Sequence, residues 1–220
     1  MFYFSLIVFQ VLRRRRQRLN IIFSAFFTSS IIASILNMIY ANLDNPSIIL
    51  ILNYFTNFFT CFGAIFVLVV NLVILESTII YSIRRQNRTI VLYALILLIG
   101  MIPFYVLEPG WGVWIHNNYP RFSPLFLIFI LGFTAGFAVI PILFTSLKIY
   151  KSFETKSLKK KWFFYFIGSL GAFSIPYTIW INNYYSFYNE NFRLIVGIYA
   201  ISMILWGYLM YYGIGFKLKQ

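Results

Sequence analysis

Three asparagines on one long apolar segment are the first residues of this sequence that could carry chemistry. Asn53, Asn57 and Asn71 fall within the uncharged run Ser47–Leu75, and steps of three or four residues connect them through Cys61, Ala64 and Leu68. Residues at these steps share one face of an α-helix. Such amides either hydrogen-bond to neighbouring helices or line a small polar cavity or relay. We favour interhelical hydrogen bonding, because no acid accompanies the amides.

Glu76 is the first charged residue after this run and the second candidate. A carboxylate inside a membrane is a functional hypothesis by default. However, a helix that enters the hydrocarbon core near Ile48 leaves it after about 20 residues, near Leu68. We therefore expect Glu76 at or below the inner headgroups, in a surface ion pair near Arg84, and not as a proton carrier.

The third group of candidates lies in two polar, aromatic loops. Amides, aromatic rings, the single histidine and both signs of charge there suit an extracytoplasmic pocket for a small polar or amphiphilic ligand. The candidate ligand-binding residues are Glu108, Trp111, Trp114, His116, Tyr185, Tyr188 and Arg193. An interfacial aromatic belt that includes Trp180 explains the same loops and stays open as the alternative.

Catalytic and cofactor chemistry is not indicated. His116 and Cys61 are the only histidine and cysteine, so a metal site and a haem held by two histidines are both excluded. The apolar segments contain no paired acids, no Ser/His dyad and no Gly-rich phosphate loop. We predict no enzyme activity and no cofactor.

The composition defines the environment in which these groups act. The chain has 220 residues, of which 61% are hydrophobic and 10% charged. A water-facing surface cannot be built from so few polar residues, so the chain is predicted to be a single polytopic membrane domain, residues 1–220. The net charge of +13 comes from short basic clusters between apolar runs, which is typical of membrane orientation signals and not of nucleic-acid binding.

The apolar runs predict an all-α membrane bundle of seven helices with a short first helix. The predicted helices are Phe2–Leu12, Leu19–Ala41, Ser47–Ile83, Thr89–Leu107, Phe122–Leu147, Trp162–Ile181 and Leu194–Gly215. The first is too short to cross a bilayer and is expected to be truncated or unusually short. The third, with its amide stripe, is expected to form the centre of the bundle.

The basic residues predict how the chain is threaded. Sixteen of the eighteen lysines and arginines follow predicted helices one, three, five and seven, and only Arg121 and Arg193 lie on the other side. The positive-inside rule then places the N-terminus outside and the C-terminus in the cytoplasm.

Several helix junctions resemble the seven-helix N-terminal sensor region of membrane histidine kinases. The similar stretches are the basic turn Arg13–Asn20, Leu147–Lys151, Lys159–Lys161 leading to Ile167-Gly168, and Tyr211–Gly215. The resemblance implies an outward N-terminus and an inward C-terminus that signals to a cytoplasmic module. No phosphoacceptor-histidine helix or ATP-binding domain follows Gln220, so kinase activity does not carry over.

These features predict a receptor-like sensory module in the cell membrane. We expect it to relay an extracytoplasmic or membrane signal to a cytoplasmic partner, with shifts of the proline- and glycine-containing fifth and sixth helices. Its expected partners are the lipid bilayer, a cytoplasmic signalling protein and, as an option, a second copy in a homodimer. The alternatives are a small transporter or a passive scaffold; no clear repeat between the two halves supports the transporter.

Overall fold

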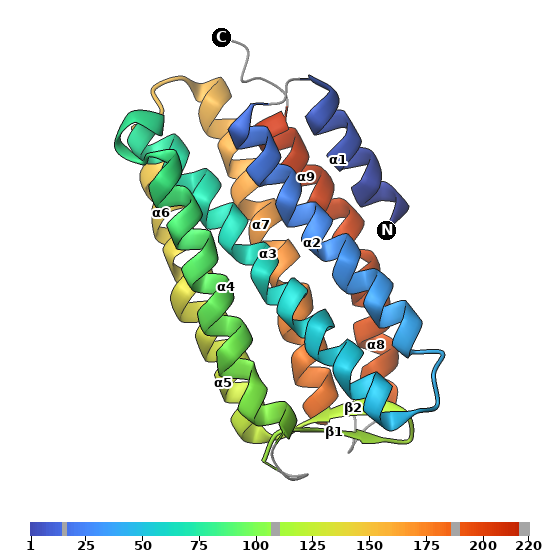
Figure 1. The fold of residues 1–220 in the computed structure, drawn as a ribbon. Helices are drawn as coiled ribbons and strands as arrows, with labels where there is room; N and C mark the ends of the chain where they lie inside the picture. The colour runs from blue at the N-terminus through green and yellow to red at the C-terminus, as the bar shows by residue number, and fades with distance from the viewer. Residues whose placement is uncertain (15–16, 107–110, 186–189, 216–220) are drawn as a thin grey trace.

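A computed structural model describes residues 1–14, 17–106, 111–185 and 190–215. It is an all-α bundle with one small hairpin at its end (Figure 1). Its helices are α1 (Phe2–Arg14), α2 (Arg18–Tyr40), α3 (Pro46–Ile80), α4 (Ile83–Val106), α5 (Pro124–Thr134), the π-helical segment η1 (Ala135–Val139), α6 (Ile140–Ser152), α7 (Lys156–Tyr185), α8 (Glu190–Ile201) and α9 (Met203–Gly215). The strands are β1 (Val113–His116) and β2 (Tyr119–Phe122). Within the described residues, six helical spans are long and apolar enough to cross a membrane, and α1 is shorter.

The helix α3 forms the centre of the bundle, as its amide stripe predicts. Asn45 caps its N-terminus, because the side-chain Oδ1 accepts hydrogen bonds from the N–H groups of Ser47 (3.0 Å) and Ile48 (3.3 Å). Pro46 occupies the first position, where its missing N–H costs nothing. More of α3 is buried than of any other described span. The helices α2, α4 and α6 pack directly against it.

The two ends of the bundle differ in character. The α1–α2, α3–α4 and α6–α7 junctions, which carry the described basic clusters, lie together at one end (Figure 1). There Arg18 donates to the side chains of Gln86 (2.8 Å) and Asn87, which ties the start of α2 to the start of α4. The helix α4 begins earlier than the predicted Thr89, because its first turns run out into this basic region. The hairpin lies at the opposite end of the bundle.

The polar, aromatic loop predicted between the fourth and fifth helices contains a regular β-hairpin. Residues Val113–His116 pair antiparallel with Tyr119–Phe122, and Asn117 and Asn118 form the two-residue turn with φ of 49° and 62°. Two asparagines with positive φ suit a tight hairpin turn, and Val113 and Phe122 face each other in the core. The hairpin packs on α4, where a Cβ on Gly112 would lie 1.8 Å from the carbonyl oxygen of Phe104.

Two predicted helices are not regular α-helices throughout. The fifth predicted helix changes to a π-helical turn at η1, which ends two residues before Pro141; this proline cannot donate a backbone hydrogen bond. The seventh is interrupted at Ser202, whose N–H bonds to the carbonyl of Tyr199 (2.9 Å), three residues back. The interrupted segment still packs tightly: a Cβ on Gly168 of α7 would lie 2.6 Å from the backbone nitrogen of Met210 in α9.

A polar cavity as the candidate functional site

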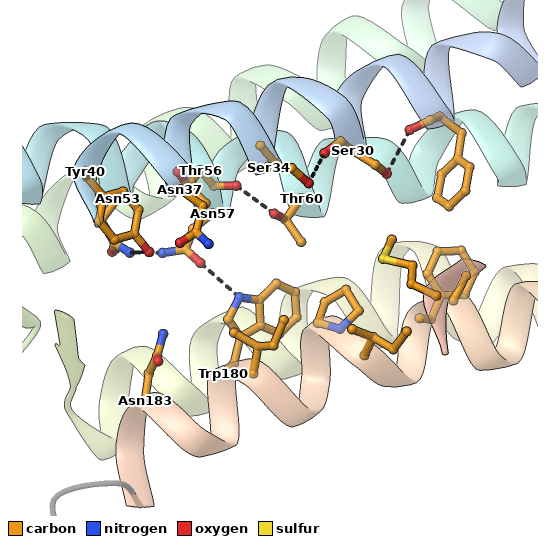
Figure 2. Close-up of a pocket in the computed structure, with 18 residues that line it drawn as sticks. Ser30, Ser34, Asn37, Tyr40, Asn53, Thr56, Asn57, Thr60, Trp180 and Asn183 are labelled. Atoms are coloured by element: carbon orange, nitrogen blue, oxygen red, sulfur yellow. Dashed lines mark hydrogen bonds between the residues drawn. The ribbon is translucent and has the colours of Figure 1, made fainter. Parts of the chain in front are cut away.

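A cavity of about 140 Å³ lies between α2, α3 and α7, in the half of the bundle nearer the hairpin (Figure 2). Its polar lining consists of Ser30, Ser34, Asn37, Tyr40, Asn53, Thr56, Asn57, Thr60, Trp180 and Asn183. The apolar lining includes Phe26, Ala172, Phe173, Pro176 and, from α9, Met203. The described lining contains hydroxyls, amides, a phenol and an indole, and no charged side chain.

Helical spacing brings these polar groups together. Ser30, Ser34 and Asn37 recur at steps of four and three along α2, and Asn53, Asn57 and Thr60 do the same along α3. The two helices are antiparallel neighbours, so the two stripes lie side by side and face α7 across the cavity (Figure 2). Ser30 lies ten residues before Tyr40, or about 15 Å deeper, which is roughly the middle of a hydrocarbon core of about 30 Å.

A hydrogen-bond network around Asn53 and Asn57 forms the wall of the cavity nearer the hairpin; outer denotes this hairpin end of the bundle, and inner denotes the basic end. The Asn57 amide donates to Asn53 Oδ1 (3.0 Å) and to the Tyr105 hydroxyl (2.8 Å), and it accepts from Trp180 Nε1 (2.9 Å). Tyr105 donates to Asn53 (2.8 Å), and Asn53 donates to Tyr40 (3.4 Å). The network therefore joins α2, α3, α4 and α7, and the same two asparagines line the cavity.

An aromatic layer closes the inner end of the cavity. The rings of Phe26 and Phe173, both in the lining, lie 6.2 Å apart. Phe27 packs against Phe26 (5.0 Å) and against Phe23 (5.2 Å) on the side away from the cavity. Phe23 and Phe27 are almost fully buried. The cavity is thus polar on its sides and apolar at its floor.

Asn71 belongs to a second cluster on the inner side of that layer. Its amide donates to Ser146 Oγ (2.8 Å), Thr145 Oγ1 (3.1 Å) and the Ile142 carbonyl (3.3 Å), and Tyr165 donates to its Oδ1 (3.0 Å). Asn71 and Tyr165 are fully buried. The burial of all three asparagines confirms that the stripe faces other helices. However, Asn71 is about 21 Å along α3 from Asn57 and lines no part of the cavity.

The candidates in the outer loops surround the hairpin end. Trp111, His116 and Tyr185 are exposed, and Trp114 is half-buried. The guanidinium of Arg193 lies 3.5 Å from the centre of the Tyr119 ring, so α8 contacts the hairpin through a cation–π interaction. Glu108 and Tyr188 lie outside the described residues. None of the described candidates lines the cavity, and a ligand pocket at this rim stays a prediction.

Two further predictions need correction. Trp180, expected in an interfacial belt, is 3% exposed because its indole bonds to Asn57 inside the bundle. Glu76 is partly buried near the end of α3, and among the described residues it forms no ion pair with Arg84 or any other base. At the same end of the bundle, between α3 and α4, burial raises the pKa of Tyr81, and the charge of Glu76 adds to this effect.

The electrostatics of the rim differ from those of the cavity. Arg121 in β2 is half-buried, and its burial lowers the pKa of the guanidinium, with a smaller contribution from the charge of Arg193. Arg193 is also close enough to interact electrostatically with Tyr40, at the outer end of the cavity. The rim therefore carries the two positive charges of Arg121 and Arg193, whereas the described cavity wall is neutral.

The sequence-based interpretation missed the α2 side of the cavity. Ser30, Ser34 and Asn37 have the same helical spacing that identified Asn53 and Asn57, but serine is common in membrane helices and small enough to be taken for packing. Thr56 and Thr60 were missed for the same reason. The signal that could have found them is the coincidence of two such stripes on consecutive, antiparallel helices.

The fold and cavity define the protein as a multi-pass, all-α membrane protein with a polar cavity inside the bundle. A comparison of the chain with protein-family models, curated proteins and solved structures finds no match.

Proposed function

We propose that this protein is a receptor-like sensory module of the cell membrane, in which a small ligand occupies the cavity between α2, α3 and α7. The observation that carries the proposal is the polar lining, which reaches about half the depth of the bilayer and ends at an aromatic floor. Polar groups are costly at this depth unless they serve packing or binding. Convergent polar groups on an otherwise apolar cavity are typical of ligand sites.

A route from the cavity to the basic end supports signalling. The floor residue Phe26 packs on Phe27, Phe27 on Phe23, and Phe23 on Tyr165 (6.4 Å). Tyr165 then donates to Asn71, which is bonded to α6. A ligand that displaces the floor would change this packing only if it binds one helix arrangement better than the other. The cytoplasmic partner would read the change at residues 148–161.

Covalent occupation of the cavity tests the proposal without knowledge of the ligand. Cys61 is the only cysteine and is buried, so Cys61→Ala gives a background for Ser34→Cys. We expect hydroxyethyl methanethiosulfonate, added outside right-side-out vesicles, to modify this variant. Occupation should then change backbone hydrogen exchange at the inner ends of α6 and α7, as measured by mass spectrometry.

Ser169→Cys in the same background is the matched control. Ser169, like Ser34, is a serine bonded to its own helix, but it is buried and lies outside the cavity lining, whereas Ser34 is half-buried in that lining. It should react much more slowly than Ser34→Cys. Equal reaction of the two variants, or modification of Ser34→Cys with unchanged exchange at α6 and α7, would refute the sensory module.

A carrier is the alternative function, and the separation between the two polar clusters argues against it. A carrier needs a polar route that reaches both sides in turn. Between Asn57 and Asn71 the inward face of α3 presents Cys61, Ala64 and Leu68, all buried and apolar. This favours a cavity with a closed floor. Flux of labelled glycerol or other small solutes into proteoliposomes, above that of protein-free vesicles, would instead support the carrier.

A further inference from the structure

We propose that the cavity takes a compact, uncharged group rich in hydroxyls, such as the glycerol unit of a free polyol or of a lipid headgroup. This inference deepens the proposed function and depends on the cavity being a ligand site. The inference is based on the hydrogen-bond donors and acceptors of the cavity wall that have no partner within the protein. A ligand must supply the complementary acceptors and donors.

Four hydroxyl groups of the cavity wall in α2 and α3 already donate their hydrogens to backbone carbonyls of their own helices. Ser30 donates to the Phe26 carbonyl (3.0 Å), Ser34 to that of Ser30 (2.8 Å), Thr56 to that of Leu52 (2.8 Å) and Thr60 to that of Thr56 (2.7 Å). A carbonyl can only accept, so each hydroxyl is fixed as the donor in these bonds. Its oxygen then faces the cavity as an acceptor. Four such acceptors require a ligand that brings several donors.

The opposite wall adds another acceptor. Pro176 in α7 has no backbone N–H, so the carbonyl of Ala172, four residues earlier, loses its usual helical partner. Ala172 and Pro176 both line the cavity. A membrane-embedded carbonyl without a helical partner is satisfied by a neighbouring side chain, a water or a ligand.

The donors left in the wall are fewer and lie towards the outer end. The Asn37 and Asn183 side chains hydrogen-bond to no residue among those that the structure describes. The Tyr40 hydroxyl accepts from Asn53 and keeps its own hydrogen for another partner. A ligand must therefore donate at depth and can accept near the rim. A hydroxyl does both, and a row of hydroxyls matches the row of wall oxygens.

The charge and the volume of the cavity restrict the class of ligand further. No carboxylate lines the described wall to pair with an ammonium group, and no lysine or arginine lines it to pair with an anion. A cavity of about 150 Å³ holds benzene in a well-studied case, and this one measures about 140 Å³. Glycerol has the same number of non-hydrogen atoms as benzene. A compact polyol therefore satisfies both the size and the polarity of the site.

Saturation-transfer NMR of the full chain in phosphatidylcholine nanodiscs, titrated with glycerol, tests the inference. We expect a saturable signal whose affinity falls roughly two- to tenfold in Thr60→Val, which keeps the side-chain shape and removes one acceptor. Thr28→Val is the matched control, because Thr28 makes the same kind of backbone bond (3.0 Å) but lies outside the cavity. Ser34→Ala is a second cavity variant, independent of the fold of α3.

A second part of the experiment distinguishes the two sources of the glycerol unit, a free polyol and a lipid headgroup. Nanodiscs containing phosphatidylglycerol, whose headgroup ends in a glycerol unit, should compete with free glycerol if the lipid is the occupant. Competition should weaken in Thr60→Val. Without competition, free polyol is the ligand.

The inference is overturned if neither arm gives saturable binding, or if Thr60→Val, Ser34→Ala and Thr28→Val all match the wild type. Displacement of glycerol by potassium chloride would identify a monovalent-cation site instead. These failures differ from a failure of the proposed function, because the Ser34→Cys experiment needs no ligand. Helix rearrangement on covalent occupation without polyol binding would overturn the ligand class alone.

Discussion

Replacing Asn71 with leucine should destabilise the bundle far more than the same substitution at Asn37 in the cavity wall. The amide of Asn71 can donate two hydrogen bonds to the α6 groups around it, and its oxygen accepts one from Tyr165. Interhelical hydrogen bonds in membranes average about 0.6 kcal/mol each, so the loss of three is worth about 2 kcal/mol. The Tyr165 hydroxyl, which is fully buried, then lacks its partner and adds about 1–3 kcal/mol. We expect a total loss of about 3–5 kcal/mol.

Reversible unfolding in a dodecyl sulfate titration measures this free energy. A double-mutant cycle with Tyr165→Phe isolates the Asn71–Tyr165 bond, and we expect a coupling energy of about 0.6–1.7 kcal/mol. Asn37→Leu is the matched control, because it makes the same substitution at an exposed asparagine whose side chain has no hydrogen-bond partner among the described residues. That control should stay within about 0.5 kcal/mol of the wild type.

The predicted role of Asn71 fails if the free energy of unfolding of Asn71→Leu lies within about 0.5 kcal/mol of that of the wild type or of Asn37→Leu. It also fails if the cycle gives no coupling, since the Tyr165–Asn71 bond (3.0 Å) would then contribute nothing to stability.

Three further predictions concern packing, capping and threading. Gly168→Ala should destabilise the protein by about 1–3 kcal/mol in the same titration, because the new Cβ would lie 2.6 Å from the backbone of Met210, whereas Gly132→Ala, which meets nothing within 4 Å, should be neutral or stabilising by up to about 1 kcal/mol. Asn45→Ala should cost about 1 kcal/mol through loss of the α3 cap, and Asn45→Ser should restore most of it; equal values for the two would contradict the cap. An impermeant amine reagent should label Lys160 in inside-out vesicles and not in intact cells, and the opposite pattern would reverse the proposed orientation.

Periodicity alone predicted most of the fold, because hydrophobic segments of this length have few alternatives in a bilayer. The seven segments, the short first one and the central position of α3 follow from apolar length and from the amide stripe. The hairpin did not follow, since hydropathy and composition predict only a polar loop around Asn117-Asn118. The break at Ser202 depends on local hydrogen bonds to Tyr199 that hydropathy does not detect.

The candidate site was predicted in part and at a different depth. Asn53 and Asn57 were identified by their cost in an apolar helix, and they do line the cavity. The polar residues Ser30 and Ser34 on α2 were not identified. Their hydroxyls donate to carbonyls of their own helix, so a serine at these positions costs little free energy in a membrane and does not stand out in the sequence. The side chain of Trp180 faces inward only because Asn57 offers it an acceptor, which is a tertiary relation.

The contrast between the two polar clusters indicates which part of the bundle the binding free energy of a ligand would stabilise. In the outer cavity, Asn37 and Asn183 can gain partners, whereas every amide group of Asn71 in the inner cluster is already bonded within the protein. A ligand can therefore lower the free energy of the outer half, while a rearrangement of the inner half breaks bonds worth about 2 kcal/mol. Since 1.4 kcal/mol corresponds to a tenfold change in an equilibrium constant, this cost favours the bonded arrangement by roughly 25-fold. A ligand must overcome that bias by binding the other helix arrangement more tightly. Asn71→Leu removes this bias, so the hydrogen-exchange difference at α6 and α7 between occupied and empty Ser34→Cys should shrink in that background; an undiminished difference would show that the inner cluster does not set the equilibrium.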